Sequence, residues 1–496
     1  MLIPNFEEFK KLAKKGNVIP VYKEINADLE TPVSAFLKLK ISDYAFLLES
    51  VEGGEKIARY SFLGSDPSMI FSSKGRKIQL LYPGKNARKS FITRSTPLDE
   101  LKKIMSGFKG VRVKGLPRFY GGLVGYIGYD MVRFFEDIPD KNPDDLKLAD
   151  SVFLLTDTIL VFDHVNHAIK IVSNVFLPRS GSLPVAVLKK YYNAALTKIA
   201  AIENNFNKPQ RPYHSKKTTD TFKFTVKSNF TKKEFKDVVL RMKEYIRRGD
   251  IIQGVPSQRF QIKTGRDAFD IFRSLRSLNP SPYMYFLKLK DLQIVGSSPE
   301  MLVRCEDGLI QTRPIAGTRP RGSNDEEDRR LSEELLKDKK ERAEHLMLVD
   351  LGRNDLGRVS QIGSVKVSEF MAVEKYSHVM HLVSEVRGKL DNKRYDVYDV
   401  LKAAFPAGTL TGSPKIRAME IIDELENVKR GPYGGAVGYF SFSHNMDTCI
   451  TIRTIVIKGN TAYIQAGAGI VADSVPAKEY TETFNKAKAL MEAIAK

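Results

Sequence analysis

The clearest helical pattern in the chain begins just after residue 230. Thr231 and Glu234 have the spacing of a capping box, in which both side chains accept hydrogen bonds from free backbone N–H groups at a helix start. The apolar positions that follow, up to Gly249, share one helical face and are Phe235, Val238, Val239, Met242, Tyr245 and Ile246. The pattern predicts an amphipathic helix over this segment.

Two apolar runs, residues 151–162 and 448–457, have the character of strands and are bounded by clusters of Gly and Pro. Helical segments occur between the strand-like runs at irregular intervals, without the regular alternation of strand and helix that a parallel sheet needs. We therefore expect an α+β fold with largely antiparallel sheets surrounded by helices.

A polar stretch at residues 203–221, with Pro209, Pro212, Lys216 and Lys217, predicts a linker or surface loop between two lobes, residues 1–215 and 222–496. The hexapeptides GGLVGY at 121–126 and GGAVGY at 434–439 nearly repeat each other across this boundary. Either each lobe uses a similar Gly-punctuated strand, or a composition suited to close strand packing recurs by chance, and six residues do not decide between the two.

The composition is that of a folded, basic protein. Among 496 residues, 28 Phe and 20 Tyr exclude a disordered chain, and 79 Lys and Arg against 59 Asp and Glu give a net charge of +20. The basic residues are interleaved with acids, as at residues 325–330, which favours attraction of a small anionic substrate. A basic nucleic-acid-binding protein is the disfavoured alternative of a different class.

Nothing in the sequence indicates a membrane or an exported protein. No apolar run approaches the roughly 18 residues of a membrane span, and the first fifteen residues alternate charged with apolar positions. Cys305 and Cys449 lie 144 positions apart without neighbouring ligands, so a disulfide framework or a zinc site is not expected. A reducing cytoplasm fits best.

Two segments carry paired carboxylates at helical spacing. Glu479, Glu482 and Lys486 share one stripe of a helix expected from about Ser474, and Glu341 and Glu344 stand three apart beside an apolar run. Carboxylates from distant helices can build a Mg²⁺ site, because Mg²⁺ takes one or two carboxylates and keeps waters. The alternative is a solvated charged face, in which Glu482 and Lys486 form a surface ion pair.

Several Gly-rich segments fail as nucleotide motifs. The segment QAGAGIVA at 465–472 opens no helix, and Pro414 interrupts the phosphate-loop-like segment at 408–415. Both remain candidates for close backbone approach to a small oxygen-rich ligand. The Arg-rich segment 313–322 suits a carboxylate or is a solvated loop. His378 and His381 could be metal ligands, a general acid or ordinary residues of a strand edge, and alone they are a weak signal.

Taken together, strings along nearly the whole chain resemble the chorismate-utilising enzymes, and most closely the anthranilate synthase component I group of that family. They are LLES at 47–50, NPSPYM at 279–284, SPE at 298–300, PIAGT at 314–318, EHLMLVD at 344–350, HVMH at 378–381, FPAGT at 405–409, GPY at 431–433 and GAG at 467–469. The resemblance implies a two-lobed α+β enzyme with its active cleft in the C-terminal lobe.

The implied reaction, the first step of tryptophan biosynthesis, converts chorismate and ammonia to anthranilate and pyruvate. Ammonia attacks C2 as the 4-hydroxyl leaves, and the enolpyruvyl group is then eliminated. By resemblance, Glu344 and Glu482 would hold Mg²⁺ with Glu341 and Glu479 in support.

The resemblance also assigns substrate contacts and proton transfers. The enolpyruvyl group would be held by Tyr433, Arg453 and the backbone of Ala468 and Gly469, and the ring carboxylate by Gly317, Thr318 and Gly467, with Lys486 nearby. Glu300 is the candidate acid for the departing hydroxyl, and His381 the candidate for proton transfer at elimination. Thr409 would complete the hydrogen bonding.

Two positions discriminate within the family. Gln253 stands where water-using members, the isochorismate and salicylate synthases, have a Lys base, and an amide cannot deprotonate water. Ala316 stands where many 4-amino-4-deoxychorismate synthases have a nucleophilic Lys; component I of that enzyme is the alternative within the family. Gly254 departs from the larger residue usual in the family, without an expected effect on the chemistry.

The resemblance implies one partner and one regulator. Neither cysteine lies in the Gly-flanked turn of a glutaminase nucleophile, so ammonia would come from a separate glutamine amidotransferase subunit, component II. L-Tryptophan would inhibit by binding a regulatory pocket formed mainly by the N-terminal lobe, at Glu49, Ser50, Pro282, Tyr283 and Met284. The plain alternative is a strand end packed on a proline turn.

Overall fold

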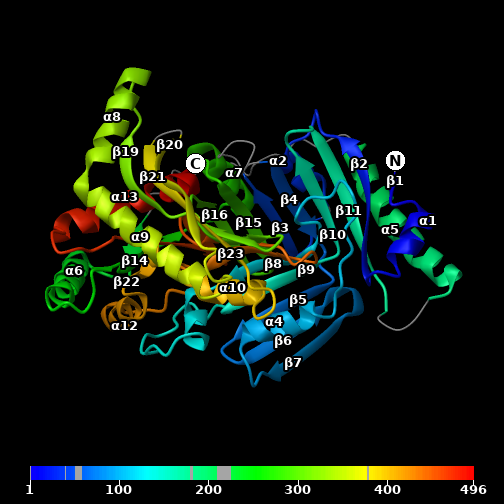
Figure 1. Ribbon diagram of the computed structural model, residues 1–496, viewed down its shortest axis with the longest axis horizontal. Coiled ribbons are helices and arrows are strands. Elements are labelled where there is room, and N and C mark those ends of the chain that lie inside the picture. Colours follow the sequence, from blue (N-terminus) through cyan, green and yellow to red (C-terminus); the bar gives the residue numbers. More distant parts are fainter. Residues whose placement is uncertain (1, 40, 51–58, 179–182, 209–224, 377–378) are drawn as a thin grey trace.

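Two large antiparallel sheets dominate the computed structural model, which describes residues 2–39, 41–50, 59–178, 183–208, 225–376 and 379–496 (Figure 1). The first sheet runs in the order β1 (Leu2–Ile3), β2 (Val18–Asn26), β11 (Ala168–Phe176), β10 (Thr158–Asp163), β4 (Tyr60–Ser65), β3 (Tyr44–Glu49), β15 (Tyr283–Leu289), β16 (Leu292–Ser298), β25 (Thr454–Lys458), β26 (Thr461–Gly467), β14 (Ser257–Lys263) and β12 (Val226–Ser228).

The second sheet has the order β19 (Ile315–Pro320), β21 (Val379–Lys389), β18 (Leu309–Thr312), β17 (Met301–Glu306), β24 (Met446–Ile450), β23 (Ala436–Ser441), β8 (Gly122–Ile127), β9 (Ser151–Thr156), β5 (Met69–Lys74), β6 (Lys77–Tyr82) and β7 (Ala87–Ile92). The strand β20 (Lys366–Lys375) pairs with β21, and β13 (Gln253–Gly254) pairs separately with β22 (Gly412–Ser413).

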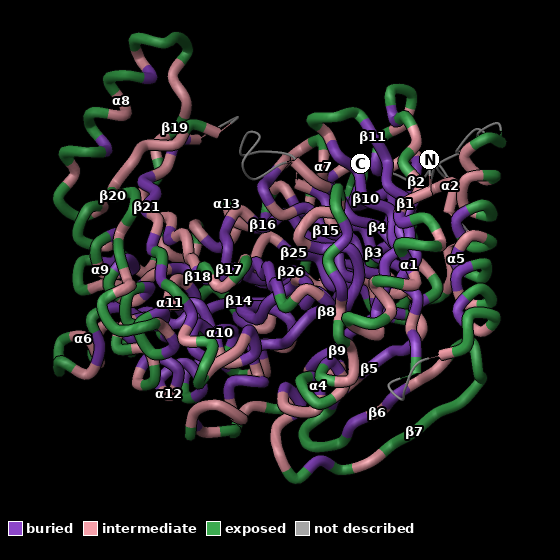
Figure 2. The backbone as a smooth tube through the Cα atoms, turned by 45° about the vertical axis from the view of Figure 1, so that its right-hand side comes forward, coloured by how far each residue is buried: buried purple, intermediate pink, exposed green. Residues whose placement is uncertain are grey.

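Helices cover the outer faces of both sheets. One core joins the first sheet to α1 (Phe6–Leu12), α2 (Pro32–Lys38), α5 (Val185–Phe206), α7 (Ala268–Leu278) and α13 (Pro476–Ala495). A second core fills the space between the sheets and reaches α4 (Pro97–Met105), α9 (Lys339–Gly357) and α10 (Val397–Ala404). A third joins α6 (Lys232–Arg247) to α12 (Lys415–Leu425). In Figure 2 the strands at the centre are buried, whereas α8 (Asp325–Lys337) projects from one end and is largely exposed.

The α+β prediction is confirmed, and so is the helix after Thr231, whose hydroxyl accepts from Glu234 N–H while the Glu234 side chain accepts from Thr231 N–H. The two strand-like runs do form strands, and each run contains two of them. Residues 151–162 form β9 and β10, and residues 448–457 lie in β24 and β25. In each run the chain leaves the second sheet and enters the first, and both strands are buried, so the apolar pattern does not reveal the break.

The expected linker begins later than predicted, because residues 203–206 complete α5, which buries Ile199 and Tyr192 against the first sheet. Residues 209–224 lie outside the described part of the chain. Both sheets take strands from either side of this region, so they are continuous across the predicted boundary between residues 1–215 and 222–496, which stays a prediction.

The two near-repeated hexapeptides are neighbours in the second sheet. Strands β8 and β23 pair antiparallel, and Gly125 lies opposite Gly438. A Cβ atom on Gly125 would lie 1.9 Å from the Val152 carbonyl oxygen, and one on Gly438 would lie 2.0 Å from that of Asp447. Close strand packing therefore requires glycine at both positions, whatever the origin of the repeat.

Candidate active site and a second pocket

The candidate site lies where two neighbouring chain segments pass between the sheets. Ser298, Pro299 and Glu300 connect β16 in the first sheet to β17 in the second, and Thr451, Ile452 and Arg453 connect β24 back to β25. The Ile450 N–H donates to the Glu300 carbonyl at 3.0 Å, and the Ser297 N–H donates to the Arg453 carbonyl at 3.0 Å. These backbone bonds hold the two crossovers side by side and bring Glu300 and Arg453 to the same region.

Glu300 has a buried carboxyl group. Burial raises its pKa to about 8, although the Thr409 hydroxyl, the Ile315 backbone N–H and the charge of Lys486 act in the opposite direction. The carboxyl is thus protonated at neutral pH and has a proton to give.

His381 lies on β21, opposite Thr318 on β19. Its Nδ1 is 2.8 Å from the carbonyl oxygen of Gly317 and 3.1 Å from the Thr318 hydroxyl. A carbonyl only accepts, so Nδ1 carries the hydrogen and the neutral ring keeps a lone pair on Nε2. Burial lowers the pKa of His381 and favours this neutral form. His378 lies outside the described residues.

The paired carboxylates come from two helices, Glu341 and Glu344 from α9 and Glu479 and Glu482 from α13. Burial raises the pKa of Glu341 and of Glu479, and in each case the neighbouring glutamate on the same helix raises it further. The charge of Lys340 on α9 lowers the pKa of Glu479 on α13, because the starts of the two helices lie close together.

This donor set fits a bound cation, which relieves such repulsion between carboxylates. No group of three or more His, Cys, Asp or Glu gathers at metal-holding distance among the described residues. A Mg²⁺ ion that keeps waters needs only one or two carboxylates, so the set fits that metal and not a closed protein cage.

Cationic side chains connect α13 to the end of β26. Lys486 Nζ lies 2.7 Å from Glu482 Oε1 and donates to the Gly467 carbonyl at 3.1 Å. Arg453, which is half-buried, donates to the Lys486 carbonyl. The phenol of Tyr433 lies beside Gly467, where an added Cβ would be 2.9 Å from its oxygen, and burial raises the pKa of Tyr433 to about 12, so the phenol is a neutral donor.

Gln253 lies beside Glu344 and Gly469. Its amide Nε2 donates to Glu344 Oε1 at 3.3 Å, and a Cβ on Gly469 would lie 2.5 Å from the same nitrogen. The Gln253 Oε1 is buried without a hydrogen-bond partner in the described part of the chain. Ala316 lies on β19 next to Gly317, opposite Leu382. The structure thus gathers, around one region, the residues that the sequence motifs single out for the substrate and the metal.

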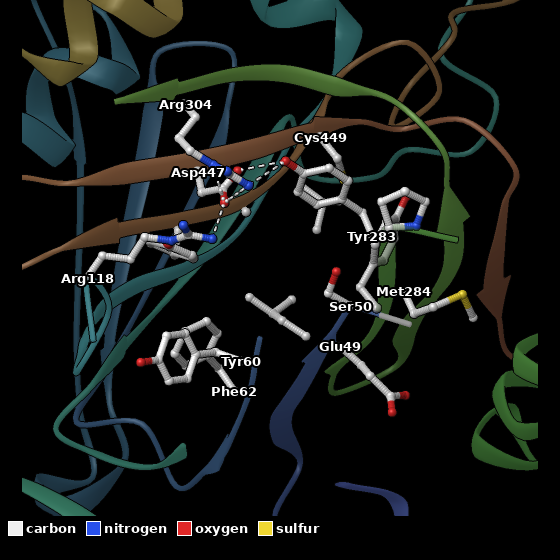
Figure 3. Close-up of a pocket in the computed structure, with 16 residues that line it drawn as sticks. Glu49, Ser50, Tyr60, Phe62, Arg118, Tyr283, Met284, Arg304, Asp447 and Cys449 are labelled. Carbon is white, nitrogen blue, oxygen red and sulfur yellow. Dashed lines mark hydrogen bonds and ion pairs between the residues drawn. The ribbon is translucent and has the colours of Figure 1, made fainter. Parts of the chain in front are cut away.

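A second pocket lies between the two sheets, lined by the central strands β3, β4 and β15 of the first sheet and β17, β23 and β24 of the second (Figure 3). All five residues expected for a regulatory ligand border it, namely Glu49, Ser50, Pro282, Tyr283 and Met284. The Ser50 hydroxyl points into the pocket, and its buried Oγ has no hydrogen-bond partner among the residues described.

Sequence motifs missed the polar wall of this pocket. The Asp447 carboxylate accepts from the Tyr283 hydroxyl at 3.0 Å, from Arg304 Nε at 2.9 Å and from Arg118 Nη2 at 3.2 Å. These residues come from distant strands and form no local pattern, so only the pairing of β17 with β24 could have indicated them.

Met284 and Glu49 are oriented differently from our expectation. They are paired neighbours on β15 and β3, and both side chains point away from the pocket (Figure 3). The Met284 side chain is buried in the core between the first sheet and the helices that cover it. The Glu49 carboxylate accepts two hydrogen bonds of 2.7 Å from Arg276. Because side chains alternate along a strand, Tyr283 and Tyr285 face the pocket, and a Met284 thioether contact with a ligand there is not formed.

Within the described part of the chain, no helix combines the length and apolar character needed to cross a membrane.

Comparison with known proteins gives one consistent group of relatives. A family model described as chorismate binding enzyme matches residues 44–492. "Anthranilate synthase component 1" of Acetivibrio thermocellus is 49% identical over 100% of this chain and 99% of its own length, and that of Aquifex aeolicus is 50% identical over 99% and 97%.

Solved structures agree. Anthranilate synthase component I from Streptococcus pneumoniae superposes with a TM-score of 0.77 at 36% identity and covers 94% of this chain and 98% of its own. The menaquinone-specific isochorismate synthase from Escherichia coli, at 18% identity and a TM-score of 0.71 over 98% of this chain and 99% of its own, shares the fold.

Proposed function

The chain belongs to the chorismate-binding enzyme family, and from that membership we propose that it converts chorismate and ammonia to anthranilate and pyruvate as the component I of an anthranilate synthase. The family membership confirms the resemblance in the sequence strings and sets aside the nucleic-acid-binding alternative. The observation that carries the proposal is near-half identity, over essentially the full length of both chains, to relatives named for this activity.

Gln253 and Ala316 favour amination over the other reactions of the family. A neutral amide beside Glu344 cannot deprotonate water, but ammonia is already a nucleophile and needs no base. Many 4-amino-4-deoxychorismate synthases use a nucleophilic lysine where this chain has Ala316, so no covalent amine intermediate forms here. That enzyme is therefore only the second candidate. We propose direct attack of ammonia on C2.

The substrate would be held by its two carboxylates and its ring. Arg453, Tyr433 and the backbone at Ala468 and Gly469 would bind the enolpyruvyl group, and Gly317, Thr318 and Gly467 the ring carboxylate near Lys486. Glu344 and Glu482 would hold Mg²⁺, with Glu341 and Glu479 in support. When bound, the ion supplies positive charge that binds the ring carboxylate and offsets negative charge during displacement.

The buried Glu300 and the half-buried His381 would move the protons. The protonated Glu300 carboxyl gives its proton to the departing 4-hydroxyl, which leaves as water, and the nearby Thr409 hydroxyl would complete the hydrogen bonding. His381, with its lone pair on Nε2, accepts the ring proton lost at C2 as pyruvate is eliminated and the ring becomes aromatic. Burial keeps each group in the protonation state that its step requires.

Ammonia would reach the site from a glutamine amidotransferase subunit, component II, in the cytoplasm. The test uses the purified chain with chorismate, MgCl₂ and ammonium salt at alkaline pH, and products are identified by fluorescence and mass spectrometry. Anthranilate and pyruvate are expected, and glutamine should support turnover only after component II is added. Accumulation of 4-amino-4-deoxychorismate would instead favour the second candidate, and turnover of glutamine by the chain alone would contradict the separate glutaminase.

We further propose that the second pocket binds L-tryptophan as a feedback inhibitor. Support comes from its aromatic lining, from the Asp447 carboxylate with Arg118 and Arg304, and from the Ser50 hydroxyl, which has no hydrogen-bond partner among the described residues and could bond a polar group of the ligand. Loss of one hydrogen bond of about 1 kcal/mol weakens binding several-fold, and a bulky side chain would fill the space. Ser50→Phe should therefore relieve tryptophan inhibition and leave uninhibited turnover unchanged; identical inhibition curves for wild type and variant would contradict the site.

A further inference from the structure

The Ser298 hydroxyl joins the two crossovers at the candidate active site. It donates to the carbonyl oxygen of Ile450 at 2.7 Å, and its own oxygen, Ser298 Oγ, accepts from the Glu300 N–H at 3.4 Å. Ile450 in turn donates its N–H to the Glu300 carbonyl at 3.0 Å. Ser298, Glu300 and Ile450 therefore form a closed ring of hydrogen bonds, and Ser298 is fully buried.

The same ring is attached to the second pocket from two sides. Through the first sheet, Ser298 is paired with Tyr283, which lines that pocket. Through the second sheet, Ile450 follows Cys449, which also lines it, and the Tyr283 hydroxyl donates to Asp447 on the same strand β24. Successive residues of β24 thus border the second pocket and contact the backbone of Glu300.

We propose that Ser298 is a positioning residue, which holds the Glu300 acid against β24 and transmits to it the displacement of β15 and β24 that a ligand in the second pocket causes. The inference rests on the proposed function and deepens it by naming the contact through which regulation reaches the chemistry. A ligand changes turnover only if it favours one arrangement of these strands over another.

The physical basis is that Glu300 depends on its surroundings for both position and protonation. Its neighbours are the Thr409 hydroxyl, the Ile315 N–H and Lys486, and Asp355 lines the cavity beside it and is paired with Lys415. A small displacement of the carboxyl from the 4-hydroxyl costs general-acid catalysis, and a less buried carboxyl loses its proton at lower pH.

The test compares Ser298→Ala with Ser297→Ala. Ser297 is the adjacent buried serine of β16, but its hydroxyl contacts Ser281 and Asn279 and not the Glu300 segment. For Ser298→Ala we expect kcat to fall roughly tenfold with KM for chorismate nearly unchanged, because the acid is misplaced and the binding groups are not. The alkaline limb of its kcat profile should move to lower pH, and the Ser297→Ala profile should stay that of wild type.

The regulatory part is tested with the same variants. Tryptophan binding, measured by calorimetry, should keep its wild-type affinity in Ser298→Ala, while saturating tryptophan should leave a substantial fraction of turnover uninhibited. Ser298→Cys keeps a weak hydrogen-bond donor of similar size, so its residual turnover at saturating tryptophan should lie between those of wild type and Ser298→Ala. It also replaces the alanine variant in the test if that variant does not fold.

The outcomes separate the inference from the function. If wild type makes anthranilate and both Ser298 variants keep the wild-type kcat profile, the positioning role is overturned and the proposed function is not. Complete tryptophan inhibition in these variants overturns the coupling. A wild-type chain that makes no anthranilate overturns the proposed function together with this inference.

Discussion

Burial would prepare Glu300 and His381 for the acid and base roles proposed for them. Removal from water disfavours the charged form of each, so the pKa of the carboxyl rises while that of the imidazole falls. Near neutral pH the carboxyl consequently holds a proton, and the neutral imidazole has a lone pair on Nε2 that can accept one. Burial is the largest cause of both pKa shifts, and for His381 the charge of Arg453 acts in the same direction.

The first prediction at this scale concerns pH. Because the Glu300 pKa is raised to about 8, its acid form is present below that pH and is lost above it. With free ammonia held constant by adjusting total ammonium, kcat should decline above about pH 8, and Glu300→Gln should lose most activity at every pH. A wild-type profile that stays level to pH 10 would exclude Glu300 as the acid.

The same shift has a consequence for stability. A carboxyl with a raised folded pKa favours the folded state below its unfolded pKa, near 4.5, and this contribution is lost as pH rises through about 8. The difference in unfolding temperature, Glu300→Gln minus wild type, should therefore be larger at pH 9 than at pH 4. Thermal scans of both proteins at the two pH values measure it.

The second prediction at this scale concerns the carboxylates. Glu344→Gln and Glu482→Gln should each abolish Mg²⁺-dependent turnover without lowering the thermal midpoint, because each removes a charged ligand oxygen from a region where like charges repel. Glu333→Gln, an exposed carboxylate on α8 paired only weakly with Lys337, is the matched control. Full activity in excess chelator would contradict the assignment.

Sequence reasoning located residues that belong to short motifs and missed those defined by pairing. Glu344, Glu482 and Ser50 could be predicted from their strings, and the structure brings them to one site or the other. Ser298 and Asp447 could not, since their roles depend on strand β24 lying beside Glu300 and Tyr283. The direction of Met284 also depends on the phase of β15, which the apolar run around it does not reveal.

At the scale of the element, the glycines of β8 and β23 decide how closely the central strands approach. Gly125→Ala or Gly438→Ala would place a methyl group about 2 Å from a backbone carbonyl, which cannot move aside without separating strands. Each substitution should lower the free energy of unfolding by about 2 kcal/mol or more, as measured by denaturant titration. Gly84→Ala, with open space around the glycine, should have little effect; equal stability of all three variants would refute the packing argument.

The helices were easier to predict than the strands for a physical reason. A surface helix such as α6 alternates polar and apolar faces, and its capping box marks the start. Strands β9, β10, β24 and β25 are buried on both faces, so the apolar pattern continues through the residues at which the chain changes sheet. The fold class was accessible from the sequence, and the two crossovers at the candidate active site were not.

At the scale of the whole molecule, the two sheets prevent the predicted lobes from unfolding separately. Strand β3 pairs with β15 and β8 pairs with β23, so each sheet has a central ladder between residues on either side of 215. We expect one cooperative transition in which fluorescence and circular dichroism coincide. Two resolved transitions, one for residues 1–215 and one for 222–496, would show instead that the lobes are independent.

The pairing of β8 with β23 also sets the order of events at the ribosome. About 310 residues separate the two strands in the chain, so at typical rates of synthesis the edge of β8 waits roughly 15 to 60 s for its partner. During that time a fully apolar strand, from Gly122 to Ile127, has one side without its native neighbour. Nascent chains of this protein must therefore be shielded by chaperones or by transient non-native contacts, and slowing translation before residue 436 should increase aggregation.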